Sequence, residues 1–552
     1  MTKRSWLIIG LLVLPGSPLQ AATDAERLLK QDIDRREQEL RERRWEDLHA
    51  PAVPAVPEVP TPETTVSETP AGPCFPIRDI QIQPVNILSA RRVQAIVAPY
   101  RGRCLRAADL TALQQALGAQ ALAEGLVTTR VVVPEQNLVS GTLHFEVWPG
   151  RIEAVRAPSL GRGELAMASV LRTGDLLNLR ALEQTVDNLN RLASQRASME
   201  LLPGEKPGGS IVALNVARTA PWQAGLSWQG EALNASKRTH TLRASATLDS
   251  PLKLSDRLTL GANANLEDQQ VDGAYGGSVD YDLPFGWWRF GIGADRFDYD
   301  NSIVSGVTTF SATGASRSWR GELARLLYRD VRQRLSLALH GKQRLSDNAI
   351  DDTAIGVSTT RVSALGLRAD FSRVAAPWVC DASVDVESGS GRSWAKPSSI
   401  DRHYARLLGS TRLQYHLTQV NFSGSINGQW SEARLAPGEQ FTLTGQVPGF
   451  SPQTLNAATG IAVQLEAAFP RQVQGAGFTS LWPMVGFAWA MAPRHAGGNT
   501  NDAEHVAALH AGITTPWQQA VMNAGVAFPL EKFSSINALE DWQISAGLSA
   551  QW

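Results

Sequence analysis

The residues of this sequence best suited to chemistry are its three cysteines. Cys74 and Cys104 lie 30 residues apart in what reads as one small module, whereas Cys380 stands alone far downstream. In an oxidising compartment such a pair can close one loop as a disulfide. We therefore expect a Cys74–Cys104 bridge.

No other set of residues has the spacing of a catalytic or metal site. The nine histidines are scattered, and no cysteine pair has zinc spacing. Gly389-Ser390-Gly391 has the composition of a phosphate-binding loop, but no helix pattern follows it, which favours a hairpin turn. With no general acid, nucleophile or phosphate loop in view, we expect a protein that is not an enzyme and uses no cofactor or metal.

Composition narrows the class of protein. The chain has 552 residues, a formal charge of −1 and 19% charged residues, with a mean hydropathy of −0.16. These values argue against a disordered chain and against a nucleic-acid binder. Beyond the N-terminus no apolar run is long enough for a membrane helix. A transmembrane β-barrel remains possible, because its alternating polar and apolar residues average to a soluble-looking hydropathy.

The N-terminus has the layout of an export signal. Lys3 and Arg4 precede the apolar stretch Trp6–Leu14, and small residues follow at Ala21-Ala22. This pattern predicts a secretory signal peptide over residues 1–21, with a buried N-terminal helix as the alternative. Export would place the mature chain in an oxidising compartment.

A highly charged segment and a proline-rich segment follow. Asp24–Asp47 holds nine acidic and seven basic residues, and pairs such as Glu37 and Arg41 have the spacing that supports a helix. Its apolar stripe is thin, consisting of Leu29, Ile33 and Leu40. The helix, taken as residues 22–48, is therefore either a solvated tail or lies inside a polar cavity. Residues 49–73, with seven prolines in Pro51–Pro73, predict an extended linker.

Two similar α/β modules come next, over residues 74–149 and 150–219. Each shows the order strand, helix, helix, strand, strand, which suits a small sheet with helices on one face. Apolar periodicity predicts helices over Ala107–Glu124 and Arg180–Leu192, and a strand over Val127–Val133.

Residues 220–552 alternate polar and apolar side chains in many segments, among them Leu258–Leu266, Phe422–Trp430 and Trp542–Trp552. A period of two indicates strands, and the apolar set can face lipid while the polar set faces a wet lumen. A soluble sandwich would show the same alternation. Small polar residues on the presumed lumen side, aromatics near strand ends such as Trp287, and an aromatic C-terminus favour the barrel. We expect the lumen to be lined by small polar rather than long charged side chains.

Several motifs closely resemble those of two-partner secretion transporters, the TpsB family of haemolysin-activator and filamentous-haemagglutinin transporters. Cys74-Phe75-Pro76-Ile77 and Tyr100–Leu105 resemble the first POTRA domain, Leu177–Arg180 resembles the second, and Tyr281–Gly286 resembles an early barrel hairpin. The resemblance implies a transmembrane antiparallel β-barrel of 16 strands over 220–552, preceded by two α/β POTRA domains and an N-terminal plug helix.

The resemblance also implies a function and a location. The chain would be a pore in the bacterial outer membrane, with its POTRA domains in the periplasm, that recognises a secreted partner exoprotein and translocates it to the cell surface. Its other partners would be outer-membrane lipids and the outer-membrane assembly machinery for insertion, with no nucleic acid. The alternatives are an assembly factor for other outer-membrane proteins and a passive channel.

This sequence departs from the family at one motif. The family's sixth extracellular loop folds into the barrel and carries the tip Val-Arg-Gly-Tyr/Phe, whose Arg faces an acid in a Phe-x-Asp wall strand. Here the tip reads Val447-Pro448-Gly449-Phe450 and the wall reads Phe487-Ala488-Trp489. Losing both charges avoids a lone buried charge. We expect a loop folded inward through apolar contacts of Phe450 and Pro448 with Trp489; a merely extracellular loop is the alternative.

Partner recognition could use an exposed sheet edge in the first POTRA-like module. An unfolded partner can add a strand to such an edge through main-chain hydrogen bonds. The candidate contacts lie in the predicted strand Val127–Val133 and are Val127, Thr129, Arg130 and Val132. A purely structural strand is the alternative.

Overall fold

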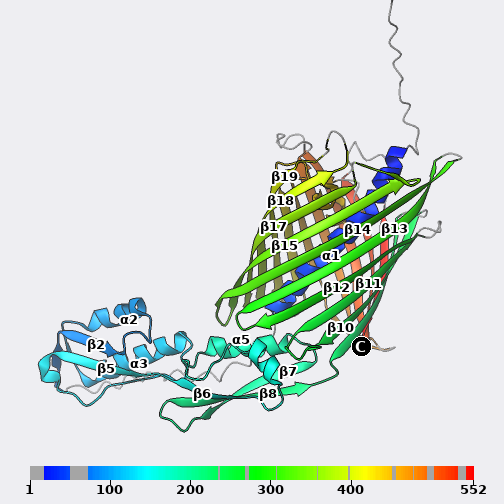
Figure 1. Cartoon of the computed structure of the whole chain (residues 1–552). Coiled ribbons are helices and arrows are strands. Elements are labelled where there is room, and N and C mark those ends of the chain that lie inside the picture. The colour runs from blue at the N-terminus through cyan, green and yellow to red at the C-terminus, as the bar shows by residue number, and fades with distance from the viewer. Residues whose placement is uncertain are drawn as a thin grey trace, which may run out of the picture.

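The structure, a computed structural model, describes residues 18–49, 73–233, 237–267, 273–305, 308–356, 358–395, 398, 400–450, 456–475, 478–493, 503–531 and 542–552. Residues 1–17 of the expected signal peptide and residues 50–72 of the expected linker lie outside this set. Figure 1 shows a barrel with two small α/β domains at one end and the helix α1 (Pro18–Leu48) inside it.

The C-terminal part of the chain forms a closed antiparallel barrel in which β28 pairs with β9. The barrel has 16 strands, because β24 (Arg471–Gly475) continues β23 along β25, and the two-residue β16 (Thr353–Ala354) belongs to the connection after β15. In order round the wall the strands are β9 (Trp222–Leu233), β10 (Lys237–Asp249), β11 (Arg257–Glu267), β12 (Gly273–Phe285), β13 (Trp288–Ser305), β14 (Thr308–Arg329), β15 (Gln333–Ile350), β17 (Thr360–Ala375), β18 (Trp378–Ser393), β19 (His403–His416), β20 (Asn421–Trp430), β23 (Gly460–Ala468), β25 (Phe478–Pro493), β26 (Ala503–Trp517), β27 (Ala520–Glu531) and β28 (Gln543–Gln551).

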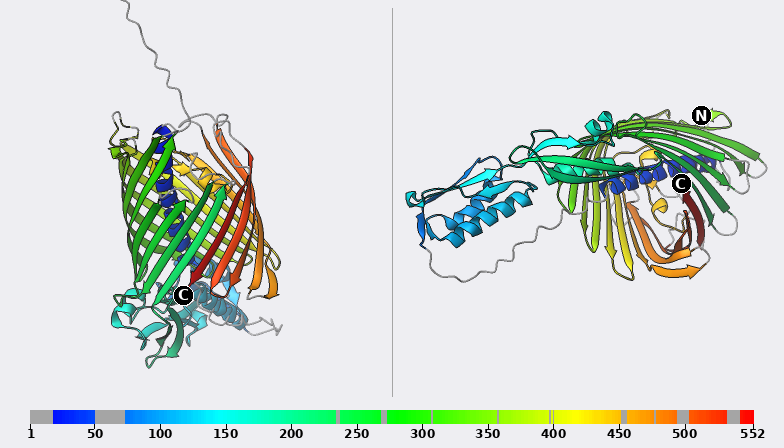
Figure 2. Two further views of the ribbon diagram at one scale, coloured as in Figure 1. Left: turned by 90° about the vertical axis from the view of Figure 1, so that its right-hand side faces the viewer. Right: turned by 90° about the horizontal axis from the view of Figure 1, so that it is seen from below.

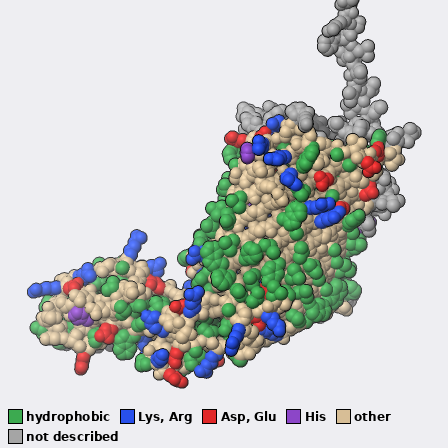
Figure 3. All heavy atoms as spheres, in the orientation of Figure 1, with side chains coloured by type: hydrophobic (Ala, Val, Ile, Leu, Met, Phe, Trp, Pro, Cys, Tyr) green, Lys and Arg blue, Asp and Glu red, His purple; other side chains and the backbone are tan. Residues whose placement is uncertain are grey.

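The outer face of the wall is apolar. On β11, Leu260 is exposed while its neighbour Thr259 is buried, as expected when successive side chains point to opposite faces. Hydrophobic side chains form a broad band over the visible wall in Figure 3, with charged side chains above and below it. Such a band is the lipid-facing surface of a transmembrane barrel. Among the described helices none is long and apolar enough to cross a membrane.

The lumen face corrects one expectation, because it carries long charged side chains as well as small polar ones. Alternate residues on adjacent strands point inward as pairs, such as Lys342 and Arg344 on β15, and Arg368 and Asp370 on β17. Arg406 on β19 is buried among them. These charges are tolerated because each is paired with an opposite charge inside the barrel.

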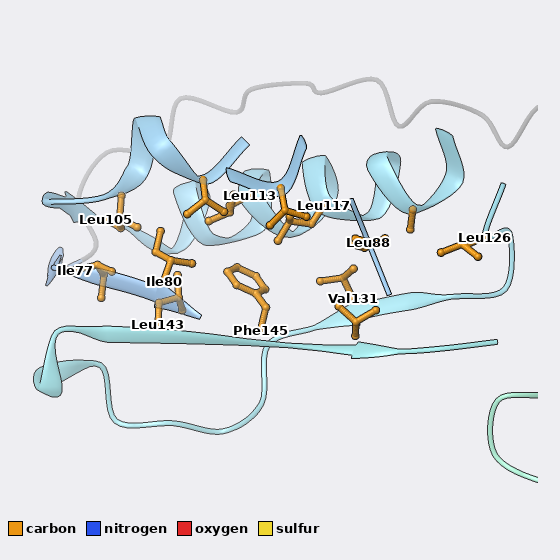
Figure 4. Packing of buried hydrophobic residues seen from close by; sticks show 14 residues of the cluster. Ile77, Ile80, Leu88, Leu105, Leu113, Leu117, Leu126, Val131, Leu143 and Phe145 are labelled. Atoms are coloured by element: carbon orange, nitrogen blue, oxygen red, sulfur yellow. The ribbon is translucent and has the colours of Figure 1, made fainter. Parts of the chain in front are cut away.

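The first α/β domain has a three-stranded sheet of order β2-β5-β4 and a separate β1–β3 pair. Its core, shown in Figure 4, packs Leu113 and Leu117 of α3 against Phe145 of β5. The elements are β1 (Phe75–Ile77), β2 (Asp79–Gln83), α2 (Ala90–Val97), the 3-10 turn η1 (Ala98–Tyr100), β3 (Arg103–Leu105), α3 (Ala107–Ala123), β4 (Arg130–Val132), η2 (Leu138–Ser140) and β5 (Thr142–Trp148).

The second α/β domain has a sheet of order β6-β8-β7, with Leu182 and Leu189 of α5 packed against Val212 of β8. Helix α5 matches the apolar periodicity of Arg180–Leu192. The elements are β6 (Arg151–Arg156), α4 (Arg162–Ala168), α5 (Leu179–Asn190), β7 (Gln195–Pro203) and β8 (Gly209–Arg218). This domain lies between the first domain and the barrel (Figure 1).

Candidate functional site in the barrel lumen

Helix α1 runs along the lumen and is visible inside the ring of strands from below in Figure 2. Its first described side chains make the apolar contacts: Leu29 and Ile33 pack against Phe297, Tyr299 and Ala312 of β13 and β14. A cavity of about 1030 Å³ remains between α1, the wall and an inward-folded loop. The charged helix therefore lies in a polar cavity rather than as a solvated tail.

Most wall contacts of α1 are polar. Near its middle, Arg36 pairs with Asp280 on β12, and Arg41 Nη1 donates to Asn427 Oδ1 at 2.6 Å. Further along, the Arg412 guanidinium lies 4.4 Å from the ring centre of Trp45. Polar groups therefore account for most of the contacts between the described part of α1 and the wall.

The C-terminal end of α1 is held at the mouth of the barrel next to the α/β domains. Asp47 Oδ2 lies 2.6 Å from Arg289 Nη1 and 3.4 Å from Arg257 Nη2. His49 Nε2 lies 2.7 Å from Oδ1 of the buried Asp381. Asp47 and His49 thus fasten this end of the helix to three strands of the wall.

The described part of the connection between β20 and β23, residues 431–450 and 456–459, folds into the lumen. It contains η3 (Pro437–Glu439), β21 (Phe441–Thr442), η4 (Thr444–Gln446) and β22 (Asn456–Ala457), and it is called the inner loop below. Its Thr442 Oγ1 donates to Asp34 Oδ2 of α1 at 2.7 Å. The inner loop and α1 therefore share the lumen and touch each other.

The loop tip Val447–Phe450 is packed against the wall. Val447 and Phe450 are buried with Ala488 and Ala490 of β25, whereas Pro448 is half-buried. Gly449 has φ +91° and donates its N–H to Gln543 Oε1 at 2.6 Å. This positive φ and the close wall suit glycine, because a Cβ would lie 3.2 Å from Pro529 Cδ.

The expected contact of the tip with Phe487 and Trp489 does not form. Phe487 pairs with Leu509, whose side chain is 48% exposed on the outer face. Because side chains alternate, Phe487 and Trp489 point outward, and the alanines at 488 and 490 face the loop. The inward fold and its apolar character agree with the expectation, but the wall partners are shifted by one residue.

The strongest polar contacts of the inner loop were not expected. Glu439 is 1% exposed, and its carboxylate lies 2.6 Å from Lys342 Nζ, 2.7 Å from Arg344 Nη1 and 2.9 Å from Arg406 Nη2. No local pattern marks a single glutamate in an irregular loop. The sign of this site in the sequence was the pair of cations at i and i+2 on β15, Lys342 and Arg344, which must point to the same face of the strand.

The candidate recognition strand is shorter than expected. Val127 packs against the core of the second domain, and Thr129 Oγ1 accepts from Gly150 N–H at 3.2 Å, so both belong to the junction between the α/β domains. The chain turns there after Gly125, whose φ is +84°. Of the four candidate residues, only Arg130 and Val132 lie on β4 (Arg130–Val132), which is an edge of its sheet. Arg130 is exposed.

Cys74 and Cys104 form a disulfide beside the β1–β3 pair. Among the described residues no group of three or more His, Cys, Asp or Glu is placed to hold a metal ion.

The second α/β domain is bound to the barrel by charged and polar groups. Arg191 pairs with Asp282 of β12, and Asn188 Nδ2 donates to the Gly286 carbonyl at 2.8 Å. Arg329 of β14 lies 2.6 Å from Asp187 of α5. Burial raises the pKa of Asp187 although Arg334 and Arg329 favour its charged form.

Comparisons with known proteins agree with this architecture. Residues 75–150 match the model "POTRA domain, ShlB-type" and residues 151–203 the model "POTRA domain". The chain is 26% identical over 400 residues to the outer membrane transporter CdiB of Dickeya dadantii (strain 3937), covering 70% of this chain and 71% of the relative. It is 28% identical over 476 residues to the hemolysin transporter protein ShlB of Serratia marcescens, covering 82% of each.

The fold matches that of CdiB from Escherichia coli, with a TM-score of 0.81 and 21% identity over 96% of this chain and 99% of that structure. The chain is an outer-membrane β-barrel whose POTRA domains lie in the periplasm. Residues 208–513, more than half of the chain, match the model "Haemolysin secretion/activation protein ShlB/FhaC/HecB". The chain therefore belongs to the ShlB/FhaC/HecB family of haemolysin secretion/activation proteins.

Proposed function

We propose that this chain carries a secreted partner exoprotein across the outer membrane, and that α1 is a plug that leaves the lumen before the partner passes. The observation that carries the proposal is a 31-residue charged helix lying inside a closed barrel. A passive channel gains nothing from a helix in its lumen, whereas a protein-conducting pore must be closed at rest. Transport of this kind makes and breaks no covalent bond.

The polar character of the plug supports its release. Its ion pairs, such as Arg36 with Asp280 and Asp47 with Arg289, face a wet cavity. These pairs are largely buried, so release of α1 requires that water or a passing polar chain supply new hydrogen bonds to the wall groups, as a polar lumen allows. The apolar contacts of Leu29 and Ile33 are confined to one end. An unfolded partner entering from the periplasm meets the opposite end first.

The sheet edges of the first POTRA domain are suited to binding the partner. In the described residues β2 and β4 are the two edges of the β2-β5-β4 sheet. Arg130 is exposed and pairs in register with Trp148, which is 57% exposed. The Val131 carbonyl already accepts from Gln114 Nε2 at 2.8 Å, so β4 offers less free main chain than the five-residue β2. We propose strand addition at β2, and side-chain contacts of Arg130 and Val132 at β4.

The surroundings of the barrel follow from its surface. The apolar band of Figure 3 supports contact with outer-membrane lipids. An exported barrel of 16 strands must close before it is stable in the membrane, and we propose that it depends on the outer-membrane assembly machinery for insertion.

Planar-bilayer conductance tests the plug. The full chain and a variant lacking Asp24–Asp47 are compared: we expect small, rare openings for the full chain and a large, stable conductance for the deletion. Equal conductance of the two would contradict the gated pore and favour a passive channel.

Export itself is tested in cells that lack the transporter but make a candidate partner exoprotein. Re-expression of the full chain should place that exoprotein at the cell surface. The matched control is Arg317→Gln, on the barrel strand β14, outside the lumen contacts described above. Surface delivery without the transporter would contradict the proposal.

A further inference from the structure

The ion pairs that the inner loop makes inside the lumen converge on one residue, Glu439. Three wall cations surround its carboxylate at 2.6–2.9 Å. The main chain beside it is also bound: the Glu439 carbonyl accepts from Arg406 Nη1 at 2.9 Å, and the Gly438 carbonyl accepts from Arg344 Nη1 at 3.0 Å. Wall side chains on β15 and β19 thus grip this turn through both its side chain and its backbone.

The tip of the loop is uncharged, and its hydrogen bond to the wall runs from the Gly449 N–H to Gln543 Oε1 at 2.6 Å. Val447–Phe450 carries no charge and packs on small wall side chains, the alanines 488 and 490. Burial of Val447 and Phe450 stabilises the packed tip, but this apolar term is non-directional and fixes no particular wall partner. The charge that fixes the loop therefore lies on η3, well before the tip, and it is acidic, with its basic partners on the wall.

The same cations also face the plug. Arg344 Nη2 lies 3.5 Å from Glu37 Oε1 of α1, and Lys342 Nζ lies 4.0 Å from it. Glu37 is more exposed and farther away than Glu439, so it is the weaker of the two partners. Thr442 and Asp34 add a direct contact between the loop and α1.

We propose that Glu439 is the positioning residue that holds the inner loop inside the barrel, and that the anchored loop forms part of the seat of the plug. The contacts predict that the position of α1 depends on the anchored loop, whereas the position of the loop does not depend on Glu37 of α1. Removing Glu37 leaves Glu439 with all three cations, so the loop stays. Removing the carboxylate of Glu439 leaves the three cations with two carboxylates, those of Glu387 and Glu37. Outward movement of the loop relieves this excess of buried positive charge by admitting water.

The test measures the position of the loop on intact cells. A Val447→Cys reporter is introduced in a Cys380→Ser background, which removes the free thiol on β18. A membrane-impermeant maleimide should label this reporter slowly, because Val447 is 2% exposed. Glu439→Gln should speed labelling about tenfold or more, as expected for a broken buried ion pair. Glu439→Asp, which keeps the charge, should restore slow labelling in part.

Two matched variants separate anchoring from general loosening. Glu466→Gln removes a lumen carboxylate that contacts Ser423 and His510 of the wall, and it should leave labelling unchanged. Glu37→Gln should raise pore conductance while leaving labelling of the loop slow. Fast labelling in Glu37→Gln would contradict the order of dependence.

Folding of each variant is checked by the mobility of the unheated barrel in gels. If Glu439→Gln does not fold, Lys342→Met, which keeps the loop intact and removes one cation, should still raise labelling severalfold. Unchanged labelling in a folded Glu439→Gln or Lys342→Met barrel overturns the proposal. Because loop position is measured without any partner, this result is independent of whether the chain exports an exoprotein.

Discussion

Nη1 of Arg334 on β15 lies 2.6 Å from the carbonyl oxygen of Leu48, the last residue of α1. Nη2 of the same guanidinium lies 2.8 Å from Asp187 Oδ2 on α5 of the second POTRA domain. One wall arginine therefore joins the end of the plug to the domain through which a periplasmic partner would act. A displacement of α5 against the barrel changes the contacts that hold α1.

A second chain of contacts makes the same connection. Asp47 of α1 lies 3.4 Å from Arg257, which lies 2.9 Å from Asp282, and Asp282 pairs with Arg191 beside α5. The C-terminal end of α1 is thus linked to the second POTRA domain through the barrel wall at two places.

Arg334→Gln should open the pore more often. The substitution removes a charged hydrogen bond to the end of α1, worth about 1.5–3 kcal/mol, so the open fraction should rise about tenfold to a hundredfold. Bilayer recordings measure the open fraction directly. Arg332→Gln, an exposed arginine in the same turn, is the matched control and should behave like the unmodified chain. Equal open fractions for the two variants would show that Arg334 does not hold the plug.

Acid should weaken the joint between the second POTRA domain and the barrel through Glu164. Burial alone would raise the pKa of this carboxyl, but hydrogen bonds from Arg218, the Gly161 N–H and Ser250 hold the pKa below its usual value. Because the pKa of Glu164 is lower in the folded than in the unfolded chain, its carboxylate stabilises the fold. This stability is fully present above the unfolded pKa of about 4.3, and it is lost as the pH falls through the folded pKa.

Urea unfolding of the periplasmic domains, followed by helical circular dichroism at pH 7 and pH 4, measures this effect. The midpoint should be lower at pH 4, and Glu164→Gln should reduce the difference between the two pH values. Glu146→Gln is the control, since Glu146 is an exposed residue whose carboxylate contacts Trp148 of its own strand, β5. A pH dependence that is the same in all three proteins would exclude Glu164 as its source.

Local patterns in the sequence were sufficient to predict where several helices and strands of the fold begin and end. Alternation placed β11, β20 and β28 within a residue or two, and apolar periodicity did the same for α3 and α5. These signals are local, because each depends on side chains a few residues apart. The side of the barrel wall that each side chain faces is harder to predict, because an error of one residue reverses it. On β25 we expected Trp489 to face the loop, whereas Ala488 does so in the structure.

The contact of Glu439 with the wall cations could not be predicted from local patterns. Glu439 and Arg344 are 95 residues apart and meet only after the barrel has closed. Nothing near Glu439 in the sequence distinguishes it from a solvated loop residue. The charged pairs at i and i+2, such as Lys342 with Arg344 and Arg368 with Asp370, do mark a charged lumen, because both members of each pair must share a face.

Loss of the disulfide should destabilise the first POTRA domain. Closing a loop of 30 residues is expected to contribute about 3–4 kcal/mol. The double variant Cys74→Ser with Cys104→Ser should therefore lower the urea midpoint of the periplasmic domains, and the unmodified chain should do the same after reduction. Cys380→Ser, which removes a thiol on the barrel wall, should change neither value. A double variant as stable as the unmodified chain would contradict a structural role for the bridge.

Gly449→Ala should loosen the tip of the inner loop. At φ +91° an alanine costs about 1–3 kcal/mol, and its Cβ would also press on Pro529 and Ala527 at 3.2–3.3 Å. The tip should leave the wall while Glu439 keeps the base of the loop in place. Maleimide labelling at Val447→Cys should therefore rise severalfold, less than in Glu439→Gln. Gly409→Ala is the control, because a Cβ there meets nothing within 4 Å. Labelling in Gly449→Ala as fast as in Glu439→Gln would mean that the tip, and not Glu439, decides where the loop lies.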